Sequence, residues 1–404
     1  MKVLLAHNFY GSSAPSGENT VFLAESALLR QKGHCVLEFT RHSDEIRGRG
    51  AVGTLQGALS TPWNPFSANK LQSVLRWERP DILHVHNFSP LLSPSIFHAA
   101  AGFETATVMT LHNYRLFCAA GIPMRNGKPC TFCLDQKSVI PALRFGCYRG
   151  SRVATAPMAL MIALHRGLQT WKHHVDAFIA LSGFQKGLMA EAGLPDAAIH
   201  VKPNFYADPP DALPWVRRKD KIVFIGRLGE EKGVQVLIQA WKAWGAKAPL
   251  LEVIGDGPLR KALSEAVSGD GLGGKIVFRG QLPFDETQQS LSRARLLILP
   301  SLCFEGFPMV VREAFALGVP VVASRLGPLP DIVKEGVAGA LFEAGNAEDL
   351  LRVVRSIWSD QDRLAELAGG ARKMFEEKYT ADTNYLTLME IYEAAIRRRR
   401  HKKS

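Results

Sequence analysis

The sequence lacks any apolar run of the ~20 residues that a membrane-spanning helix needs. The longest candidate, residues 154–164, contains a threonine and a proline and is followed by a histidine–arginine pair. The first residues turn polar after a short apolar start and show no cleavage-like region, so we expect no secretory signal. These absences predict a cytoplasmic protein.

Several catalytic signatures are also missing. No G-x-G-x-x-G follows the first strand-like run, which disfavours a nicotinamide-dependent dehydrogenase. The sequence contains neither H-E-x-x-H nor G-x-S-x-G, which mark metalloproteases and serine hydrolases. Residues 269–275 have the spacing of a phosphate-binding loop, but Ile276 stands where that loop requires Ser or Thr. We therefore expect a turn there.

Length and composition indicate a globular protein of several domains. A chain of 404 residues exceeds one ordinary core and predicts two or three domains. Hydrophobic residues make up 47% and charged residues 22%, which excludes wholesale disorder, a collagen-like repeat and a coiled-coil rod. The net charge is +11, and residues 397–403 supply six of the positive charges. We expect this tail to be a solvated terminus or to contact an anionic membrane, and we expect no nucleic acid as partner.

Short apolar runs alternate with helical patterns along the chain, which is typical of α/β proteins with parallel sheets. The runs predicted as strands are residues 2–6, 36–39, 81–86, 106–111, 177–181, 221–226, 250–255, 275–279, 296–300 and 319–324. Residues 200–210 contain three prolines and several polar residues and are predicted to be a linker. We predict two Rossmann-like domains, residues 1–203 and 204–380, followed by a helix and basic tail over 381–404.

The helix predicted near the end of the chain has a clear apolar stripe. Its members recur at spacings of three and four and are Tyr385, Leu388, Met389, Tyr392 and Ile396. Such a stripe must be buried. Periodicity leaves open whether the helix packs locally or crosses back to the first domain.

Residues 299–318 carry the clearest site signal. We expect a helix that begins near Pro308 and ends just before Gly318. Unpaired backbone N–H groups at the start of a helix attract phosphate or another polar ligand. Glu305 precedes this helix and Glu313 lies inside it. The two carboxylates either accept hydrogen bonds from one extended polyhydroxylated ligand or are surface glutamates that flank an amphipathic helix.

This segment resembles the E-x7-E signature of retaining glycosyltransferases with the GT-B fold, known as glycosyltransferase family 4. Further segments resemble motifs of that family in the same order: G-R-L-x-x-x-K-G at 226–233, G-x-G-P at 255–258, F-x-G at 278–280 and G-x-P-V-V at 318–322. Asp331 departs from the pattern, which commonly has Glu there. The resemblance implies two Rossmann-like domains that face a central cleft.

The resemblance implies a donor-binding loop after the strand at 221–226. Arg227 and Lys232 would hold the diphosphate of a nucleoside-diphosphate sugar, and Gly226 would belong to the same donor site. Both cations suit this role, because fixed positive charge stabilises the charge that develops on a leaving phosphate. The alternative for each is a solvated loop charge.

The family also implies roles for the residues around the two glutamates. Glu305 would act at the catalytic centre by accepting hydrogen bonds from the donor sugar, with the backbone N–H groups of Gly306 and Phe307 nearby. Glu313 would accept hydrogen bonds from the ribose hydroxyls. A glycine at 306 lets a ligand approach the backbone closely.

The first half resembles the family more loosely, as an acceptor-binding domain. Ser16-Gly17 stands where the family commonly has Gly-Gly, and we expect Gly17 to face the donor. Residues 110–113 resemble the T-x-H-D element, which implies that His112 lies near the sugar ring of the donor. The alternative is that His112 is a structural histidine.

His84 and His86 lie on the same side of a predicted strand, because side chains alternate along strands. We expect a pair at the strand end in a polar cleft. Metal ligation is the alternative.

Four cysteines fall in an insertion at about residues 115–150. Cys118, Cys130, Cys133 and Cys147 have the pattern C-x11-C-x2-C-x13-C. In a reducing compartment, four thiols with one C-x2-C turn can hold a structural zinc ion. Reduced free thiols and a redox pair remain open.

Basic and aromatic residues accompany an apolar helical segment at residues 141–174. Such a segment can lie on a membrane interface, or it can be a buried helix with polar ends. Acceptors in the resembled family are often lipid-linked sugars, which favours peripheral contact with the inner face of the cytoplasmic membrane.

Together these features predict a retaining glycosyltransferase of polysaccharide or glycolipid biosynthesis. It would move a sugar from a nucleoside-diphosphate sugar to a saccharide or lipid-linked saccharide. We expect neither a catalytic metal nor an organic cofactor, because cationic side chains and helix-terminal amides would carry the charge of the leaving group. Two alternatives stay open: a nucleotide-sugar epimerase or hydrolase on the same fold, and a non-catalytic nucleotide-sugar-binding protein.

Overall fold

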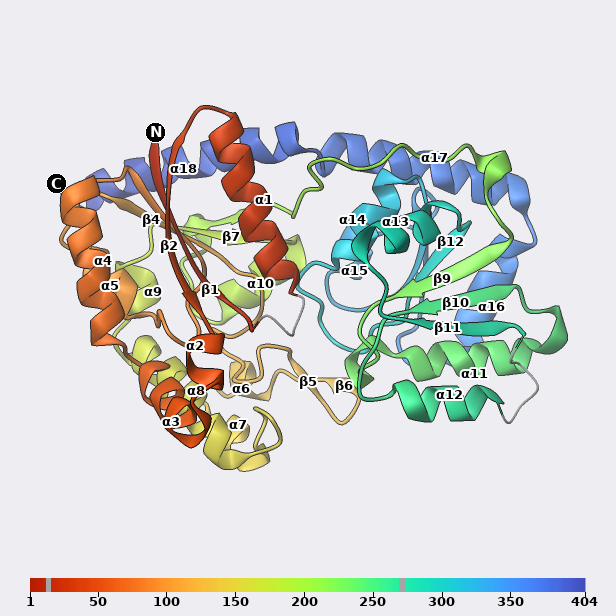
Figure 1. Ribbon diagram of the computed structural model, residues 1–404, viewed down its shortest axis with the longest axis horizontal. Helices are drawn as coiled ribbons and strands as arrows, with labels where there is room; N and C mark the ends of the chain where they lie inside the picture. The colour runs from red at the N-terminus through yellow and green to blue at the C-terminus, as the bar shows by residue number, and fades with distance from the viewer. Residues whose placement is uncertain (12–15, 269–273, 404) are drawn as a thin grey trace. The chain divides into compact units, whose positions relative to one another are not determined.

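The computed structural model describes residues 1–11, 16–268 and 274–403. Residues 12–15 and residues 269–273 of the predicted turn lie outside these ranges. The chain divides into two compact units (Figure 1): unit 1 comprises Met1–Pro123, Thr131–Pro203 and Ala381–Ser404, and unit 2 comprises Met124–Cys130 and Asn204–Thr380. This division differs from the predicted layout, because it joins the C-terminal segment to unit 1 and assigns part of the cysteine-rich insertion to unit 2.

Unit 1 contains a six-stranded sheet in the order β2-β1-β3-β4-β7-β8. All neighbouring strands pair in parallel. The strands are β1 (Lys2–Phe9), β2 (Cys35–His42), β3 (Ile82–Asn87), β4 (Ala106–Thr110), β7 (Ala177–Ala180) and β8 (Ile199–Val201). Every residue of β3, β4 and β7 is buried, as expected for parallel strands that are covered on both faces.

Strand β8 corrects one prediction. Residues 200–210 were expected to be a linker, but His200 and Val201 pair with Ile179 and Ala180 of β7. The prolines that suggested a linker begin only after this strand. They drew attention away from a short strand-forming run, which pairs at the edge of the sheet.

The helices of unit 1 occupy the connections between its strands and the C-terminal segment. They are α1 (Gly17–Gln31), α2 (Asp44–Arg47), α3 (Gly50–Ser60), α4 (Pro65–Glu78), α5 (Ser95–Ala100), α6 (Phe132–Asp135), α7 (Ile140–Phe145), α8 (Arg152–Gly167), α9 (Thr170–His173), α10 (Gly183–Glu191) and α18 (Ala381–Lys403). Local sequence explains several helix starts. For example, the Asn64 side chain accepts hydrogen bonds from the backbone N–H groups of Phe66 and Ser67 at the start of α4.

The apolar stripe of the last helix is buried in unit 1. Four residues of α18 join the core of the first sheet: Leu388, Ile391, Tyr392 and Ala395. Tyr385, Met389 and Ile396 pack against the same cluster and are partly buried. The predicted stripe therefore has a partner, and the helix returns to the first sheet.

The basic tail is part of α18 and is anchored. Arg399 is only 4% exposed, and its guanidinium donates to the backbone carbonyls of Ala100, Ala101 and Phe103. Lys402 Nζ lies 2.8 Å from a carboxylate oxygen of Asp176. The expectation of a wholly solvated or membrane-bound tail is therefore wrong for these two residues.

Unit 2 contains a second six-stranded parallel sheet in the order β11-β10-β9-β12-β13-β14. Its strands are β9 (Lys221–Ile225), β10 (Leu250–Ile254), β11 (Ile276–Gly280), β12 (Leu296–Leu299), β13 (Val321–Ser324) and β14 (Gly339–Phe342). Strand β14 was not predicted. A small antiparallel hairpin, β5 (Met124–Arg125) and β6 (Lys128–Pro129), also belongs to this unit.

The α-helices of unit 2 alternate with its strands. They are α11 (Val234–Trp244), α12 (Arg260–Ser268), α13 (Phe284–Ser292), α14 (Met309–Ala316), α15 (Leu329–Ile332), α16 (Ala347–Trp358) and α17 (Gln361–Lys378). The predicted α/β class and the pair of Rossmann-like sheets are confirmed.

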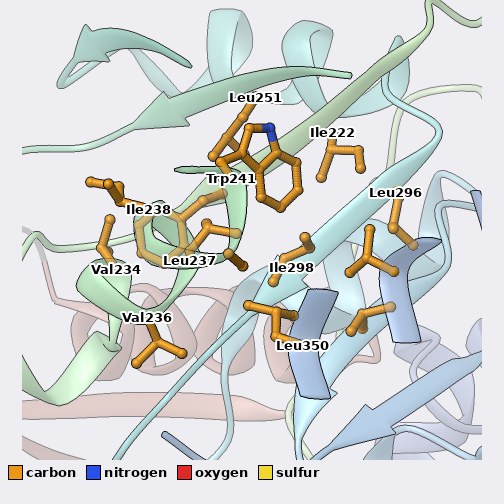
Figure 2. Packing of buried hydrophobic residues seen from close by; sticks show 14 of the residues in the cluster. Ile222, Val234, Val236, Leu237, Ile238, Trp241, Leu251, Leu296, Ile298 and Leu350 are labelled. Carbon is orange, nitrogen blue, oxygen red and sulfur yellow. The ribbon is translucent and has the colours of Figure 1, made fainter. Parts of the chain in front are cut away.

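The core of unit 2 lies between helix α11 and the sheet. Figure 2 shows Trp241 and Leu237 of α11 among Ile222 and Leu251 of the central strands. All four side chains are buried, and the Trp241 Nε1–H group donates to the Pro249 carbonyl at 2.9 Å. Burial of each such side chain contributes about 1.5–3 kcal/mol to folding. This core fixes the strand ends from which the site loops leave.

Candidate active site

Strand order in unit 2 creates a natural ligand site. From β9 the sheet continues to β10 and β11 on one side and to β12, β13 and β14 on the other. Open α/β sheets bind ligands at such a switch point, outside the carboxyl ends of the strands. The loops that leave β9 and β12 carry Arg227, Lys232 and Glu305. The topology therefore gathers three predicted site residues at one edge of the sheet.

Two glycines allow these loops to pack backbone against backbone. Gly255 follows β10 with φ +134°, and a Cβ there would lie 2.0 Å from the carbonyl oxygen of Gly226. Gly233 has φ +65°, and its Cβ would lie 1.9 Å from the carbonyl oxygen of Pro300. Any side chain would force the loops apart. The glycine-rich motifs thus place the charged residues close together.

Lys232 and Glu305 form an ion pair between these loops. The Lys232 ammonium lies 2.7 Å and 2.9 Å from the two carboxylate oxygens of Glu305. The Ser301 hydroxyl donates to Oε1 of the same carboxylate at 2.6 Å. The backbone N–H of Leu302 donates to the Glu231 carbonyl at 2.9 Å and joins the two loops. The structure therefore brings together the predicted phosphate-binding cation and the predicted sugar-binding carboxylate.

The environment keeps Lys232 charged. Burial alone would lower the pKa of Lys232, but the neighbouring Glu305 carboxylate outweighs burial and raises the pKa above its ordinary value. Burial also raises the pKa of the nearby Cys303 thiol, so this group stays neutral. Lys232 therefore keeps its positive charge, and the Glu305 carboxylate balances it.

Arg227 lies on the same loop but is not part of this pair. Its side chain is exposed and has no ion-pair partner within the described ranges. Gly226, which precedes it, is partly buried. The loop therefore carries one paired cation, Lys232, and one unpaired cation.

Glu313 occupies a separate, more enclosed position on α14. Gln288 Nε2 donates to its Oε2 at 3.1 Å, and the Arg312 guanidinium lies 3.9 Å from its Oε1. Burial raises the pKa of the Glu313 carboxyl above its ordinary value, which Arg312 partly offsets. Glu305 and Glu313 are 8% and 9% exposed, so neither is a surface glutamate.

The start of α14 matches the predicted geometry. The helix begins at Met309, directly after Pro308, and Gly318 has φ +64° just beyond its end. Phe307 is 7% exposed and its ring packs against the Tyr379 ring at 5.6 Å between centroids. Gly306 is partly exposed beside it. The predicted boundaries of this helix are confirmed.

In unit 1 the predicted site residues Gly17 and His112 lie on two different connections, one after β1 and one after β4. Gly17 is the first residue of α1, and the adjacent Glu18 accepts a hydrogen bond from Asn113 Nδ2 at 2.9 Å. Asn113 directly follows His112. The start of α1 and the segment that carries His112 therefore lie side by side. Burial raises the pKa of the Glu18 carboxyl.

His84 and His86 are not a pair in a polar cleft, and this expectation is wrong. They are 0% and 2% exposed, and each has a ring nitrogen 3.1 Å from the buried Glu25 carboxylate. His86 also lies 3.1 Å from His112, nitrogen to nitrogen. Ligand atoms of Glu25, His84 and His86 lie within 4.8 Å of one another, but Lys202 already neutralises the carboxylate at 2.9 Å. A buried hydrogen-bond network therefore replaces the expected polar cleft.

Two family models match the chain. The model described as Glycosyltransferase Family 4 matches residues 15–207, and that of Glycosyl transferases group 1 matches residues 210–374. Among solved structures, Anabaena Alr3699/HepE in complex with UDP aligns with a TM-score of 0.69 at 17% identity, over 98% of this chain and 100% of that one. Sucrose-phosphate synthase from Thermosynechococcus elongatus aligns with a TM-score of 0.70 at 16% identity, over 97% and 98%. The protein is a GT-B glycosyltransferase.

Curated relatives of this glycosyltransferase include 2-deoxystreptamine N-acetyl-D-glucosaminyltransferase of Streptomyces fradiae. It is 28% identical over 84% of this chain and 77% of its own length. The N-acetyl-alpha-D-glucosaminyl L-malate synthase of Bacillus anthracis is 22% identical over 83% and 80%. The sulfoquinovosyl transferase SQD2 of Arabidopsis thaliana is 35% identical, but the match spans 40% of this chain and 31% of that protein.

Three of the four cysteines of the predicted zinc site lie near one another: Cys118, Cys133 and Cys147. Burial raises the pKa of the Cys118 thiol to about 12, and the neighbouring Cys133 and Cys147 add to the shift. Cys130 lies in the segment assigned to unit 2. The zinc site remains a prediction. Among the described helices, none is both long and apolar enough to cross a membrane.

Sequence reasoning missed several residues that contact the predicted ones. Ser301 carried no signal beyond its place four residues before Glu305. Glu25 did carry one: it falls among the buried positions of α1, between Phe22 and Leu28, where a lone carboxylate indicates a buried partner. That partner, Lys202, is remote in the sequence and was not foreseeable.

Proposed function

We propose that this glycosyltransferase moves a sugar from a nucleoside-diphosphate sugar to a saccharide or lipid-linked saccharide, with retention of anomeric configuration. The observation that carries the proposal is the Lys232–Glu305 pair at the switch point of unit 2. The complexes of HepE with UDP and with UDP-glucose support a donor of this class. The named relatives, which transfer or attach sugars, support the reaction type.

In the proposed reaction, the donor diphosphate competes with Glu305 for the Lys232 ammonium. Arg227, exposed on the same loop, adds a second positive charge to the phosphates. Glu305 then accepts hydrogen bonds from sugar hydroxyls while Ser301 keeps its carboxylate oriented. Glu313 accepts hydrogen bonds from the ribose. The positive charges of Lys232 and Arg227 stabilise the leaving diphosphate.

The bond changes balance without a further reactant. The bond between the anomeric carbon and the diphosphate oxygen breaks, and its electron pair goes to the diphosphate. The acceptor hydroxyl oxygen forms the new bond on the same face of the sugar. Its proton passes to the departing phosphate, which is near the charge of Lys232.

The test begins with a thermal-shift screen of nucleotide sugars, because a cognate donor stabilises the folded protein. Product formation is then measured for Lys232→Met and Glu305→Gln, with Lys247→Met, an exposed lysine of unit 2, as the control. We expect kcat to fall about 100-fold or more in the first two variants. Transfer at the wild-type rate in either would overturn the assignment.

The same assay separates the two alternatives. An epimerase or hydrolase converts the donor without any acceptor, whereas a binding protein stabilises with the donor and forms no product with any acceptor in a panel. Transfer that depends on the acceptor excludes both.

A structural zinc ion at Cys118, Cys130, Cys133 and Cys147 is part of the proposal. Its support is the C-x2-C spacing and the proximity of Cys118 to Cys133 and Cys147. The elements around these cysteines are short, α6 having four residues and α7 six, so a metal would stabilise a segment with little core of its own. Elemental analysis of wild type and Cys130→Ser tests this, and protein without near-stoichiometric zinc contradicts it.

We also place a peripheral membrane contact on unit 1. Helices α3, α7 and α8 carry large apolar side chains that are mostly exposed: Val52, Leu55, Leu59, Ile140, Val153 and Leu160. The exposed Arg49, Arg144 and Arg152 accompany them. Apolar side chains beside cations complement an anionic lipid surface. Such a surface suits a lipid-linked acceptor at the inner face of the cytoplasmic membrane.

A further inference from the structure

His112 is the partly exposed end of a chain of hydrogen bonds that runs into unit 1. Its Nε2 lies 3.1 Å from Nδ1 of His86, and Nε2 of His86 lies 3.1 Å from a carboxylate oxygen of Glu25. The three side chains come from the end of β4, from β3 and from α1. Glu25 and His86 are buried, whereas His112 is partly exposed. The chain therefore joins a buried carboxylate to a predicted substrate contact.

The carboxylate at the inner end is ionised. Lys202 Nζ donates to its second oxygen at 2.9 Å and also to Asn384 Oδ1 of α18 at 3.3 Å. Burial alone would raise the pKa of Glu25, but the Lys202 ammonium, with the adjacent His84, holds it well below its ordinary value. One carboxylate and one ammonium leave this interior without net charge.

His84, the other histidine that contacts the Glu25 carboxylate, carries no charge. His84 Nδ1 lies 2.8 Å from the Tyr392 hydroxyl and 3.1 Å from Glu25, and its Nε2 lies 2.8 Å from the Thr110 hydroxyl. Burial lowers the pKa of His84 to about 4, so its imidazole is neutral at physiological pH. A cationic His86 in the same interior would be a buried charge without a counter-charge, which is costly.

These charge states determine which atom donates in each hydrogen bond between Glu25, His86 and His112. A carboxylate has no hydrogen to donate, so Nε2 of His86 carries the hydrogen and donates to Glu25. A neutral imidazole has a single N–H, so Nδ1 of His86 accepts, and Nε2 of His112 must donate to it. This leaves a lone pair on Nδ1 of His112, for which no partner exists among the described residues. Burial holds the pKa of His112 well below its ordinary value, so the ring is neutral.

We propose that Glu25 and His86 are positioning residues that hold His112 as its Nε2–H tautomer, so that its Nδ1 accepts a hydrogen bond from a substrate hydroxyl. The hydroxyl is one of the donor sugar, and this identification rests on the proposed function. The tautomer itself rests only on the contacts within unit 1. The Lys202 ammonium keeps Glu25 ionised, and Asn384 of α18 accepts a hydrogen bond from the same ammonium.

The test reads the tautomer directly and needs no substrate. Long-range ¹H–¹⁵N correlation spectra of the full chain, labelled with ¹⁵N-histidine and recorded at about pH 7.5, report which ring nitrogen carries the hydrogen. His112→Gln assigns the signals. We expect a protonated Nε2 and an unprotonated Nδ1 for His112. A protonated Nδ1, alone or together with Nε2, overturns the proposal whether or not the protein transfers sugar.

Two double variants separate positioning from folding. Glu25→Gln with Lys202→Met removes the charge pair but keeps a carbonyl oxygen that can accept from His86. Glu25→Leu with Lys202→Met removes the acceptor at similar volume. We expect the first to keep the tautomer and the second to give mixed tautomers with kcat about tenfold lower. An unchanged tautomer in a folded Leu variant overturns the role of Glu25.

Discussion

Lys202 and Glu25 are 177 positions apart in the chain, yet the ammonium of one lies 2.9 Å from the carboxylate of the other inside unit 1. Both side chains are almost wholly buried, at 2% and 1% exposed. Desolvating two charges is expensive, and their mutual attraction offsets the cost only while both are present. The pair therefore makes the interior of unit 1 sensitive to the loss of either partner.

Lys202→Met should destabilise the protein by about 3–5 kcal/mol, because Glu25 is left as a buried charge without its partner. Urea unfolding measures the free energy. Glu25→Gln with Lys202→Met should recover much of the loss. Lys32→Met is the control: Lys32 pairs with exposed Asp382 at 2.7 Å, and the expected cost is below about 1 kcal/mol. Equal effects of the two lysine variants would contradict the buried pair.

Stability should fall as the pH drops below about 6.5. Burial lowers the pKa of His7 to about 3 and that of His84 to about 4, both from 6.5 in the unfolded chain. Between these values and 6.5 the unfolded state binds more protons, so the free energy of unfolding rises with pH in this window. His7→Phe, beside Phe9 and Phe22, should flatten the slope measured by urea unfolding between pH 4.5 and 7. An unchanged slope would count against the buried neutral His7.

Tyr392→Phe should cost about 1 kcal/mol, because it removes only the hydroxyl at 2.8 Å from His84. Tyr392→Ala should cost about 3–5 kcal/mol, because it also empties a fully buried site between α18 and the sheet. Leu386→Ala, at an exposed position of the same helix, serves as control. The melting temperatures of the three variants, measured by thermal unfolding, give their order of stability. If Tyr392→Ala behaved like the control, α18 would not pack on unit 1.

Gly255→Ala should lower both stability and transfer. Its φ of +134° suits glycine, and a Cβ would lie 2.0 Å from the carbonyl oxygen of Gly226 on the donor loop. We expect a loss of at least about 2 kcal/mol. Gly274→Ala meets nothing within 4 Å and should stay within about 0.5 kcal/mol of wild type. Unfolding and kcat are measured for both, and a neutral Gly255→Ala would show that the loops do not pack as described.

Leu55→Gln with Leu160→Gln should weaken binding to anionic vesicles. The two side chains are 60% and 57% exposed on α3 and α8, so the fold should tolerate the change. Co-sedimentation with phosphatidylglycerol vesicles is compared with phosphatidylcholine vesicles. Val216→Gln, at an 86% exposed site of unit 2, is the control. Wild-type protein that shows no preference for the anionic vesicles contradicts the membrane contact.

Much of the fold could be predicted because its signals are local. Alternation of apolar runs and helical patterns located ten of the twelve strands of the two large sheets. The two that were missed, β8 and β14, are short runs at sheet edges, where a strand has one neighbour and needs less apolar sequence. Pro308 and Gly318 marked the ends of α14 because their backbone preferences act within a few residues.

The α/β class, the glycine-rich loops and the candidates Lys232 and Glu305 could all be inferred from local sequence, since each depends on neighbouring residues. Three relationships became visible only in the folded chain. Lys232 and Glu305 form an ion pair across 73 positions, α18 returns to unit 1, and Glu25 contacts Lys202 and His86. Periodicity reveals that a stripe or a charge must be buried but carries no information about its partner. That partner is selected by the packing of elements distant in sequence, where burial makes a missing counter-charge or hydrogen bond too costly.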